Sequence, residues 1–467
     1  MERAVTGLGG RCGRGFYTYL SMSYAAAIDR LNAMVPELHA LPGHPRRKFS
    51  LDEIRVLLGA LGDPQRRFPA VLIAGTNGKG STAATLASIL KVSGVCTGLY
   101  TSPHLERVNE RICVDGEEIG EEAFAKLYFR VDGAARRLLG EGRLPQFPSF
   151  FEILTAQALC YFAEVGVKIA VLEVGMGGRL DATNVVDPLL SIVTDISLDH
   201  TEWLGPTISA IAREKAGILR PSGTLISLPQ DGEANQVLSE VVAAQNVREV
   251  DAGRYLPPAG TGTLGAYSVE AMGREIEVDS PLLGEHQRRN LALAIAAAVD
   301  LAEKHGFQVT PDSIAGGIRG TRWPGRLERI GAGGVEWILD VAHNAAGACA
   351  LRAGLADLAG RVEEKRPRTL VFSCLRDKPL AEMAQILFPL FDHVICAPIH
   401  TARATAMDDL LTAARAVGVG AVPAGSVEEA LRFAKEKTPS GAIVISGSVY
   451  LVGEARSLLL QEQGGKK

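Results

Sequence analysis

The sequence predicts an α/β protein with two mostly parallel sheets, one in each half of the chain. Short apolar strands alternate with amphipathic helices over residues 71–200, and the alternation restarts after residue 328. Several strands end in polar residues, as VLEVG does near Glu173 and LLSIVTDIS does before Asp199. Such alternation produces parallel sheets, which bind ligands at the carboxyl ends of their strands. We therefore expect functional side chains to gather at one edge of a sheet.

Composition limits the classes of protein that the chain can represent. Its 467 residues suggest two or three domains of roughly 150 residues each, and 47% hydrophobic residues are ample for their cores. The net charge of −4 gives no support to nucleic-acid binding, and no apolar run approaches the ~20 residues of a membrane span. The seven cysteines are scattered without a C-x-x-C pair, which suits reduced thiols in a cytoplasmic protein.

The first element, residues 71–90, joins an apolar strand to a helix through a glycine-rich turn. Its spacing differs from the usual P-loop, since only two residues separate Gly75 from Gly78 and Gly80 lies between Lys79 and the next serine. Glycines let backbone N–H groups surround an anion, the helix adds free donors, and the lysine supplies a mobile charge. An ordinary glycine turn is the alternative, but the three features together favour a phosphate site in a P-loop-type ATPase domain.

The next two loops carry polar and aromatic side chains. TSPHLERVNERI (101–112) follows a strand and contains Ser102, and PSFFE (148–152) places two adjacent aromatic residues at the start of a helix. Flat aromatic faces could stack on a heteroaromatic ring, although packing in the core explains them equally well.

Two later strands end beside candidate metal ligands. Glu173 precedes a glycine-rich loop containing Asp181, an arrangement typical of sites that hold the Mg²⁺ of a bound nucleotide. For Asp181 a role as a turn or helix cap competes with this interpretation. His200 follows the next strand, and its position beside a predicted metal carboxylate makes a ligand role about as well supported as a structural one. We expect Glu173 and His200 to converge on one Mg²⁺.

The segment AREKAGIL (212–219) is predicted to be helical, and composition alone places Glu214 and Lys215 at the solvated surface. Residues 222–285 are richer in Gly, Pro and polar residues, and pieces such as YSVEAM and REIEV predict a small β-rich section there. After it, VEWILD, RTLVFS, HVICAP and AIVISG are predicted strands with helices between them. They predict a second, Rossmann-like α/β domain without a G-x-G-x-x-G motif.

Changes in composition mark the domain boundaries. The first residues are rich in Gly and Arg, so we expect those before Met22 to lack packed contacts. They represent either a disordered extension or a start codon placed too early. The expected divisions are a disordered extension over residues 1–21, an ATP-binding central domain over 22–318, a linker over 319–328, where Pro and Gly cluster, and a Rossmann-like domain over 329–467.

Nine motifs together resemble one known family. GTNGKGST, TSPHL, FEILT, EVGMGGRLDATN, DHTEWLG, EKAGIL, PGRLE, LDVAHN and the late SGS (446–448) occur in the order found in the folylpolyglutamate synthase/dihydrofolate synthase family, a branch of the Mur-type ATP-dependent amide ligases. The resemblance covers nearly the whole chain. Gly80 is itself a mark of this branch, whereas HPRRKFSLDEI (44–54) departs from the family's pattern.

The resemblance implies a role for each matching residue. ATP would be bound by Gly75, Thr76, Asn77, Gly78, Lys79, Gly80, Ser81 and Thr82 at its phosphates, and by Asn290, Arg326 and Asp340 from the far side of the cleft. Mg²⁺ would be held by Ser102, Glu173 and His200, and a carboxylated Lys215 would assist a second Mg²⁺. The pteridine would lie near Phe150 and the loop of Leu180, Asp181 and Ala182. Lys79, His200 and Lys215 would carry the catalysis.

The implied activity is the ATP-dependent ligation of L-glutamate to folate, and also to dihydropteroate, with ATP and two Mg²⁺ as cofactors. Phosphorylation of the substrate carboxylate would create an acyl phosphate, which the amine of glutamate attacks. Closure of the C-terminal domain would exclude water from this intermediate. We expect a cytoplasmic monomer with no nucleic-acid or membrane partner.

Three alternative functions compete with this interpretation. A cell-wall Mur ligase with a nucleotide-sugar substrate is disfavoured by Gly80 and by TSPHL. A P-loop GTPase or kinase switch is disfavoured because the sequence lacks an Asn-Lys-x-Asp signature and the second domain would have no purpose. A non-catalytic binding protein has the least support, since every expected catalytic residue type is present. The motifs leave open whether both ligations occur.

Overall fold

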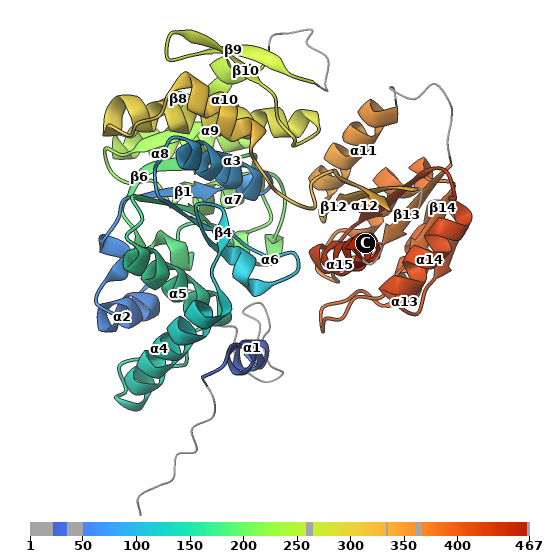
Figure 1. Cartoon of the computed structure of the whole chain (residues 1–467), viewed down its shortest axis with the longest axis horizontal. Helices are drawn as coiled ribbons and strands as arrows, with labels where there is room; N and C mark the ends of the chain where they lie inside the picture. The colour runs from blue at the N-terminus through green and yellow to red at the C-terminus, as the bar shows by residue number, and fades with distance from the viewer. Residues whose placement is uncertain (1–21, 35–49, 258–264, 333–334, 360–366, 465–467) are drawn as a thin grey trace, which may run out of the picture.

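The computed structural model describes residues 22–34, 50–257, 265–332, 335–359 and 367–464. Two α/β domains, each built around one sheet, make up this part of the chain (Figure 1). The predicted disordered extension over residues 1–21 lies outside the described residues, as does most of the segment 44–54. None of the described helices combines the length and the apolar character that crossing a membrane requires.

The N-terminal domain is built around an eight-stranded sheet with the order β4-β3-β2-β5-β1-β6-β7-β8. Its strands are β1 (Ala70–Ala74), β2 (Thr97–Tyr100), β3 (Ile112–Val114), β4 (Glu117–Glu118), β5 (Ile169–Glu173), β6 (Pro188–Val193), β7 (Thr224–Ser227) and β8 (Arg248–Asp251). The six from β2 to β8 in this order pair in parallel, and β3 and β4 pair antiparallel at one edge. Strands β2 to β5 lie on one side of β1 in the sheet, and strands β6 to β8 lie on the other. The carboxyl end of β1 therefore lies where ligands bind in such sheets.

Alternate residues of β1 belong to two different cores, one on each face of the sheet. Ala70, Leu72 and Ala74 pack in the first core, and Val71 and Ile73 pack in the second, as the strand period of two requires. Helices of the first core are α1 (Tyr24–Asn32), α2 (Asp52–Ala60), α4 (Glu121–Gly140), α5 (Phe150–Val165), α7 (Ile208–Ala216) and α8 (Gly232–Gln245). Helices of the second core are α3 (Lys79–Val92), α9 (Glu285–His305) and α10 (Pro311–Arg319). Burial on both faces explains why the strand is apolar throughout.

The small β-rich section predicted for residues 222–285 is only partly correct. Strands β7 and β8 extend the main sheet and are joined by helix α8, while β9 (Tyr267–Ala271) and β10 (Arg274–Val278) form a separate two-stranded sheet. The alternation of apolar and polar residues that predicted β9 matches the alternating burial of its side chains. Helix α8 was not predicted because only a few of its residues are buried and its sequence contains many polar residues.

The C-terminal domain contains a six-stranded sheet in the order β11-β12-β16-β13-β14-β15. Its strands are β11 (Glu328–Ala332), β12 (Val335–Asp340), β13 (Arg368–Phe372), β14 (His393–Cys396), β15 (Ala421–Pro423) and β16 (Ala442–Ser446). Its helices are α11 (Ala345–Ala359), α12 (Leu380–Leu387), α13 (Met407–Ala416), α14 (Val427–Lys437) and α15 (Val449–Gly464). All pairs are parallel except β11 with β12, which confirms the predicted second α/β domain; β11 and β15 were not predicted.

A connector and a loop are two of the places where the domains meet. Residues 320–327 lead from α10 to β11, and the linker bounds 319–328 stay a prediction. In the loop after β2, Leu105 packs against the C-terminal core and Glu106 pairs with Arg456 of α15. Short helical turns complete the described elements: α6 (Thr201–Leu204), η1 (Pro64–Arg66), η2 (Val108–Arg111), η3 (Ala182–Val185), η4 (Ala252–Tyr255) and η5 (Phe388–Leu390).

Candidate active site

The predicted phosphate loop forms the turn between β1 and α3. The backbone carbonyl of Asp195 accepts hydrogen bonds from the N–H groups of Thr76 at 2.8 Å and of Asn77 at 3.3 Å, which ties the loop to the end of β6. Lys79 is the first residue of α3, and its Nζ donates to the carbonyls of Gly75 and Thr76, both at 3.1 Å. Its ammonium group therefore lies over the loop, where a bound phosphate would be contacted.

Two glycines of this loop lie against side chains from distant parts of the chain. Gly78 has a φ of +90°, and a Cβ there would collide with Oδ1 of Asn290 from α9. A Cβ at Gly80 would lie 2.6 Å from the indole ring of Trp323 in the connector. Asn290 thus lies beside the loop, whereas the resemblance implied a contact with ATP from the far side of the cleft. Trp323 was not predicted. The inserted Gly80 is explained by this contact, because no larger residue fits beneath the ring. Ser81 and Thr82 follow, buried in the first turn of α3.

Gly80→Ala is expected to lower the stability of the protein by about 1–3 kcal/mol, since the indole of Trp323 must move to admit the methyl group. Gly59→Ala in α2 is the matched control, because a Cβ there meets nothing within 4 Å. That change should be neutral or slightly stabilising. Thermal unfolding of both variants makes the comparison. If the two variants have equal stability, the Trp323 contact does not constrain the loop.

The candidate metal ligands lie at the ends of β5 and β6. Glu173 is buried, and its Oε2 accepts a hydrogen bond from the backbone N–H of Ser102 at 3.0 Å. Burial raises the pKa of Glu173, although the charge of Lys79 and the bond from Ser102 partly offset this rise. The structure thus brings Ser102 and Glu173 together, and it places Lys79 close enough to act on the carboxylate.

His200 occupies a left-handed turn, with a φ of 50°, at the start of α6. Burial lowers the pKa of its ring to about 4, so the ring is neutral at pH 7 and able to bind a metal. Ser102 and His200 line one cavity, but the convergence of His200 with Glu173 stays a prediction. Over the described ranges, no three His, Cys, Asp or Glu side chains form a metal-binding group, whereas the predicted set includes a serine hydroxyl. The oxygen donors of Ser102 and Glu173 have the chemistry that Mg²⁺ prefers.

Lys215 is buried, so the interpretation of this residue as a surface charge is wrong. It lies on α7 with 4% of its surface exposed, and its Nζ donates to the carbonyl of Gly75 at 2.6 Å. Burial, together with the nearby charge of Lys79, lowers its pKa to about 7. Its neighbour Glu214 is half-buried, lines the same cavity as His200 and pairs with Arg179 at 2.9 Å. A buried lysine with a strongly lowered pKa beside a predicted phosphate loop has functional chemistry available to it.

The four predicted folate-binding residues line the cavity of about 690 Å³ that Ser102 and His200 also line: Phe150, Leu180, Asp181 and Ala182. The guanidinium of Arg111 lies 5.1 Å from the centre of the Phe150 ring and so covers part of it. The cavity therefore joins an aromatic side chain to the candidate metal site.

The Asp181 carboxylate is held within its own loop. It accepts hydrogen bonds from the N–H of Met176 at 3.0 Å and from the N–H and hydroxyl of Thr183 at 3.0 and 2.6 Å. Burial raises its pKa, which these bonds partly offset. Asp181 therefore does stabilise a turn, which was the alternative to a role in metal binding, and this turn forms part of the cavity wall.

Arg326 and Asp340 lie where the connector meets β12. Asp340 is buried, and its carboxylate accepts hydrogen bonds from the N–H groups of Leu327 and Ala342, both at 2.9 Å. Burial raises the pKa of Asp340 and lowers that of Arg326, while each partly offsets the shift of the other by its charge. Arg326 also acts on Glu173, so this C-terminal pair lies near the candidate metal carboxylate.

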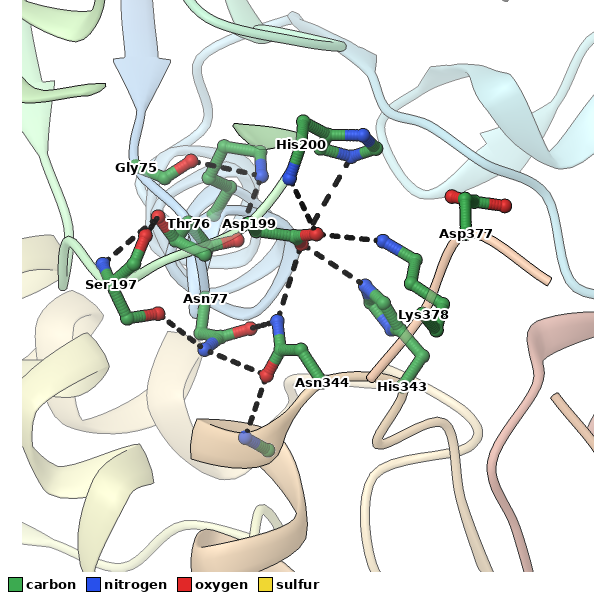
Figure 2. Close-up of polar contacts among 12 residues, drawn as sticks. Gly75, Thr76, Asn77, Ser197, Asp199, His200, His343, Asn344, Asp377 and Lys378 are labelled. Atoms are coloured by element: carbon green, nitrogen blue, oxygen red, sulfur yellow. Dashed lines mark hydrogen bonds and ion pairs between the residues drawn. The ribbon is translucent and has the colours of Figure 1, made fainter. Parts of the chain in front are cut away.

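The sequence interpretation missed three residues that the C-terminal domain contributes to the site: His343, Asn344 and Lys378. All contact Asp199 beside the phosphate loop (Figure 2). Two of them belong to LDVAHN, a motif from which only Asp340 was assigned. Lys378 follows the predicted strand RTLVFS, and polar residues after a parallel strand were the available signal.

Two family models match the chain in succession. The Mur ligase middle domain matches residues 73–298, and the Mur ligase glutamate ligase domain matches residues 325–449.

Curated relatives with similar sequences carry folate-related names. The folylpolyglutamate synthase of Lacticaseibacillus casei is 36% identical over 456 residues, which cover 95% of this chain and 100% of that protein. The dihydrofolate synthase/folylpolyglutamate synthase of Bacillus subtilis is 34% identical over 432 residues, covering 89% of this chain and 97% of that one. The probable bifunctional folylpolyglutamate synthase/dihydropteroate synthase of Halobacterium salinarum is 38% identical over 410 residues, or 86% of this chain. The match spans 48%, about half, of that longer protein.

Solved structures share the fold over nearly the whole chain. Mycobacterium tuberculosis folylpolyglutamate synthase complexed with ADP and AMPPCP has a TM-score of 0.81 and 32% identity, covering 88% of this chain and 95% of that one. Escherichia coli FolC in complex with DHPP and ADP has a TM-score of 0.79 and 28% identity, covering 94% and 98%.

Proposed function

Because the chain belongs to the Mur-type ligase family that contains the folylpolyglutamate and dihydrofolate synthases, we propose that it uses ATP to join L-glutamate to folate and to dihydropteroate. The observation that carries the proposal is the continuity of the site. The cavity lined by Phe150 and Ala182 is also lined by Ser102, whose backbone bonds to Glu173, close to Lys79 of the phosphate loop. A substrate bound there would direct its carboxylate toward the phosphates of ATP.

The proposed reaction proceeds through an acyl phosphate. The γ-phosphoryl group of ATP passes to the substrate carboxylate, and the amine of glutamate then attacks the activated carbon and displaces phosphate. Lys79 offsets the negative charge that gathers on the phosphoryl oxygens during transfer. Mg²⁺, one ion held by Ser102, Glu173 and His200 and a second assisted by carboxylated Lys215, would supply further positive charge at the phosphates.

The remaining proposed contacts divide between nucleotide and folate. Asn290 binds ATP from beside the phosphate loop. Arg326 and Asp340 bind it from the side of the C-terminal domain. The pteridine lies against the exposed part of Phe150 and the loop from Leu180 to Ala182. Closure of the domains then excludes water, which would hydrolyse the acyl phosphate.

We further propose that the protein acts as a monomer in the cytoplasm. The six described cysteines are free, as expected of thiols kept reduced. Sedimentation of the full chain with MgADP tests the monomer, and a stable dimer at micromolar concentration would contradict it.

The decisive experiment supplies the full-length protein with ATP, Mg²⁺ and labelled L-glutamate, and offers dihydropteroate or tetrahydrofolate in parallel. Labelled dihydrofolate and labelled tetrahydrofolyl-diglutamate are the expected products, identified by mass. Labelled D-glutamate is the matched control and should give no product. Release of ADP without any labelled pterin product would contradict the proposal. Product from one substrate alone would limit the activity to that ligation.

A further inference from the structure

The carboxylate of Asp199 joins the two domains beside the phosphate loop (Figure 2). Its Oδ1 accepts hydrogen bonds from Nζ of Lys378 at 2.8 Å and from the backbone N–H of His200 at 2.9 Å. Its Oδ2 accepts one from Nδ2 of Asn344 at 3.3 Å and lies 3.8 Å from Nε2 of His343. Three side chains of the C-terminal domain therefore converge on one residue of the N-terminal domain.

Asp199 and Lys378 form a buried ion pair. Their side chains are 11% and 5% exposed. Nζ of Lys378 lies 2.8 Å from Oδ1 of Asp199 and supplies the counter-charge of the carboxylate. Either member of the pair alone would be a buried charge without compensation, which is strongly unfavourable.

Asn344 extends the same contact to the phosphate loop. Nδ2 of Asn344 donates a hydrogen bond to Oδ1 of Asn77 at 3.1 Å. Nδ2 of Asn77 donates a longer one, of 3.4 Å, to Oδ1 of Asn344. Oδ1 of Asn344 also accepts the N–H of Gly347 at 2.8 Å, which fixes this side chain to the start of α11. The C-terminal domain thus contacts the phosphate loop directly at Asn77, and it contacts His200 indirectly through Asp199.

We propose that Asp199, Lys378 and Asn344 form an interdomain latch that positions His200 and Asn77 when the domains close. They are positioning residues, which act through the two residues that face nucleotide and metal. When the domains separate, Lys378 and Asn344 leave Asp199, its carboxylate becomes hydrated, and the N–H of His200 loses a rigid partner. The inference rests on the proposed function for the assignment of His200 as a metal ligand.

Backbone amide hydrogen exchange of the full chain, measured with MgADP, tests the latch. Lys378→Met leaves Asp199 in place, so faster exchange over residues 197–203 reports lost positioning across the interface. Arg456→Gln is the matched control, because it removes another interdomain cation, whose partner Glu106 lies outside the latch. We expect about tenfold faster exchange in Lys378→Met and less than about twofold in the control. Equal acceleration in both variants, or none in Lys378→Met, would overturn the proposal.

A double-mutant cycle tests whether the two charges act as a unit. Asp199→Asn, Lys378→Met and the double variant are titrated with ADP over a range of Mg²⁺ concentrations by calorimetry. Each single change should weaken Mg²⁺-dependent binding about 10- to 100-fold, and the double change should add little to either. Multiplying effects would show that Lys378 acts independently of Asp199 and would overturn the latch. These titrations need neither folate nor glutamate, so an intact latch in a protein that makes no folyl product would contradict the proposed function alone.

Discussion

Replacing Lys79 with alanine is expected to abolish glutamate ligation, lowering kcat by about 10³-fold or more. The ammonium of Lys79 donates to two loop carbonyls, at Gly75 and Thr76, and water can replace both bonds. Nothing replaces its charge, which in the proposed reaction would stabilise the phosphoryl oxygens most strongly during transfer. The measurement is the initial rate of labelled glutamate incorporation at saturating ATP and folate.

Lys91→Ala is the matched control for this prediction, because Lys91 is an exposed lysine in the last turn of the same helix. Its rate and thermal stability should equal those of the wild type. The Lys79 variant should keep its thermal stability while losing its activity. Undiminished turnover in Lys79→Ala would remove the glycine loop from the mechanism.

Lys215→Ala should lower activity by about 10²-fold or more, and added acetate or formate should partly restore it. We expect the Lys215 amine to add to CO₂ and release a proton, forming a carbamate with two oxygens and a negative charge. Such a group would assist Mg²⁺, whereas an ammonium group would repel it. The carbamate nitrogen keeps one N–H, so the hydrogen bond to the carbonyl of Gly75 can persist.

The pH dependence of this modification has a definite sign. Only the neutral amine reacts with CO₂, and burial has lowered the pKa of Lys215 to about 7. At constant dissolved CO₂, the modified fraction should therefore rise as pH increases through 7. Labelled ¹³CO₂ and carbon NMR measure it, with Lys215→Ala as the blank. Failure of the wild type to take up label, together with a variant that short carboxylates do not rescue, would contradict the prediction.

Local patterns predicted most of the fold because the sheets are parallel and buried on both faces. Strand β1 is apolar at every position, and the glycines and Lys79 that follow it mark the turn into α3. Helix α8 and the short edge strand β15 bury little, so hydrophobic periodicity gave no signal for them. Elements were predictable where burial imposed a pattern on neighbouring residues.

The site was less predictable because its contacts cross the chain. Lys215 resembles a surface lysine in its own helix, and only the packing of α7 against the phosphate loop buries it. The bond from Lys378 to Asp199 joins residues 179 positions apart in different domains. Family resemblance assigned Lys215 and Asp340, but neither it nor periodicity gave the partners of Asp199.

The connector has a consequence for how such a protein can be recombined. The connector lies between the domains, yet its residues contact both of them. Trp323 packs on Gly80, and the charge of Arg326 influences the carboxylates of Glu173 and Asp340. In a chimera that takes its C-terminal domain from a relative, a crossover before Trp323 pairs the indole with a glycine of the other parent. A crossover anywhere within 320–327 separates Arg326 from either Glu173 or Asp340. Crossovers there join two halves of the proposed nucleotide site. The connector and the phosphate loop are thus expected to be inherited as a single block, and the modular unit of exchange is larger than either sheet with its helices.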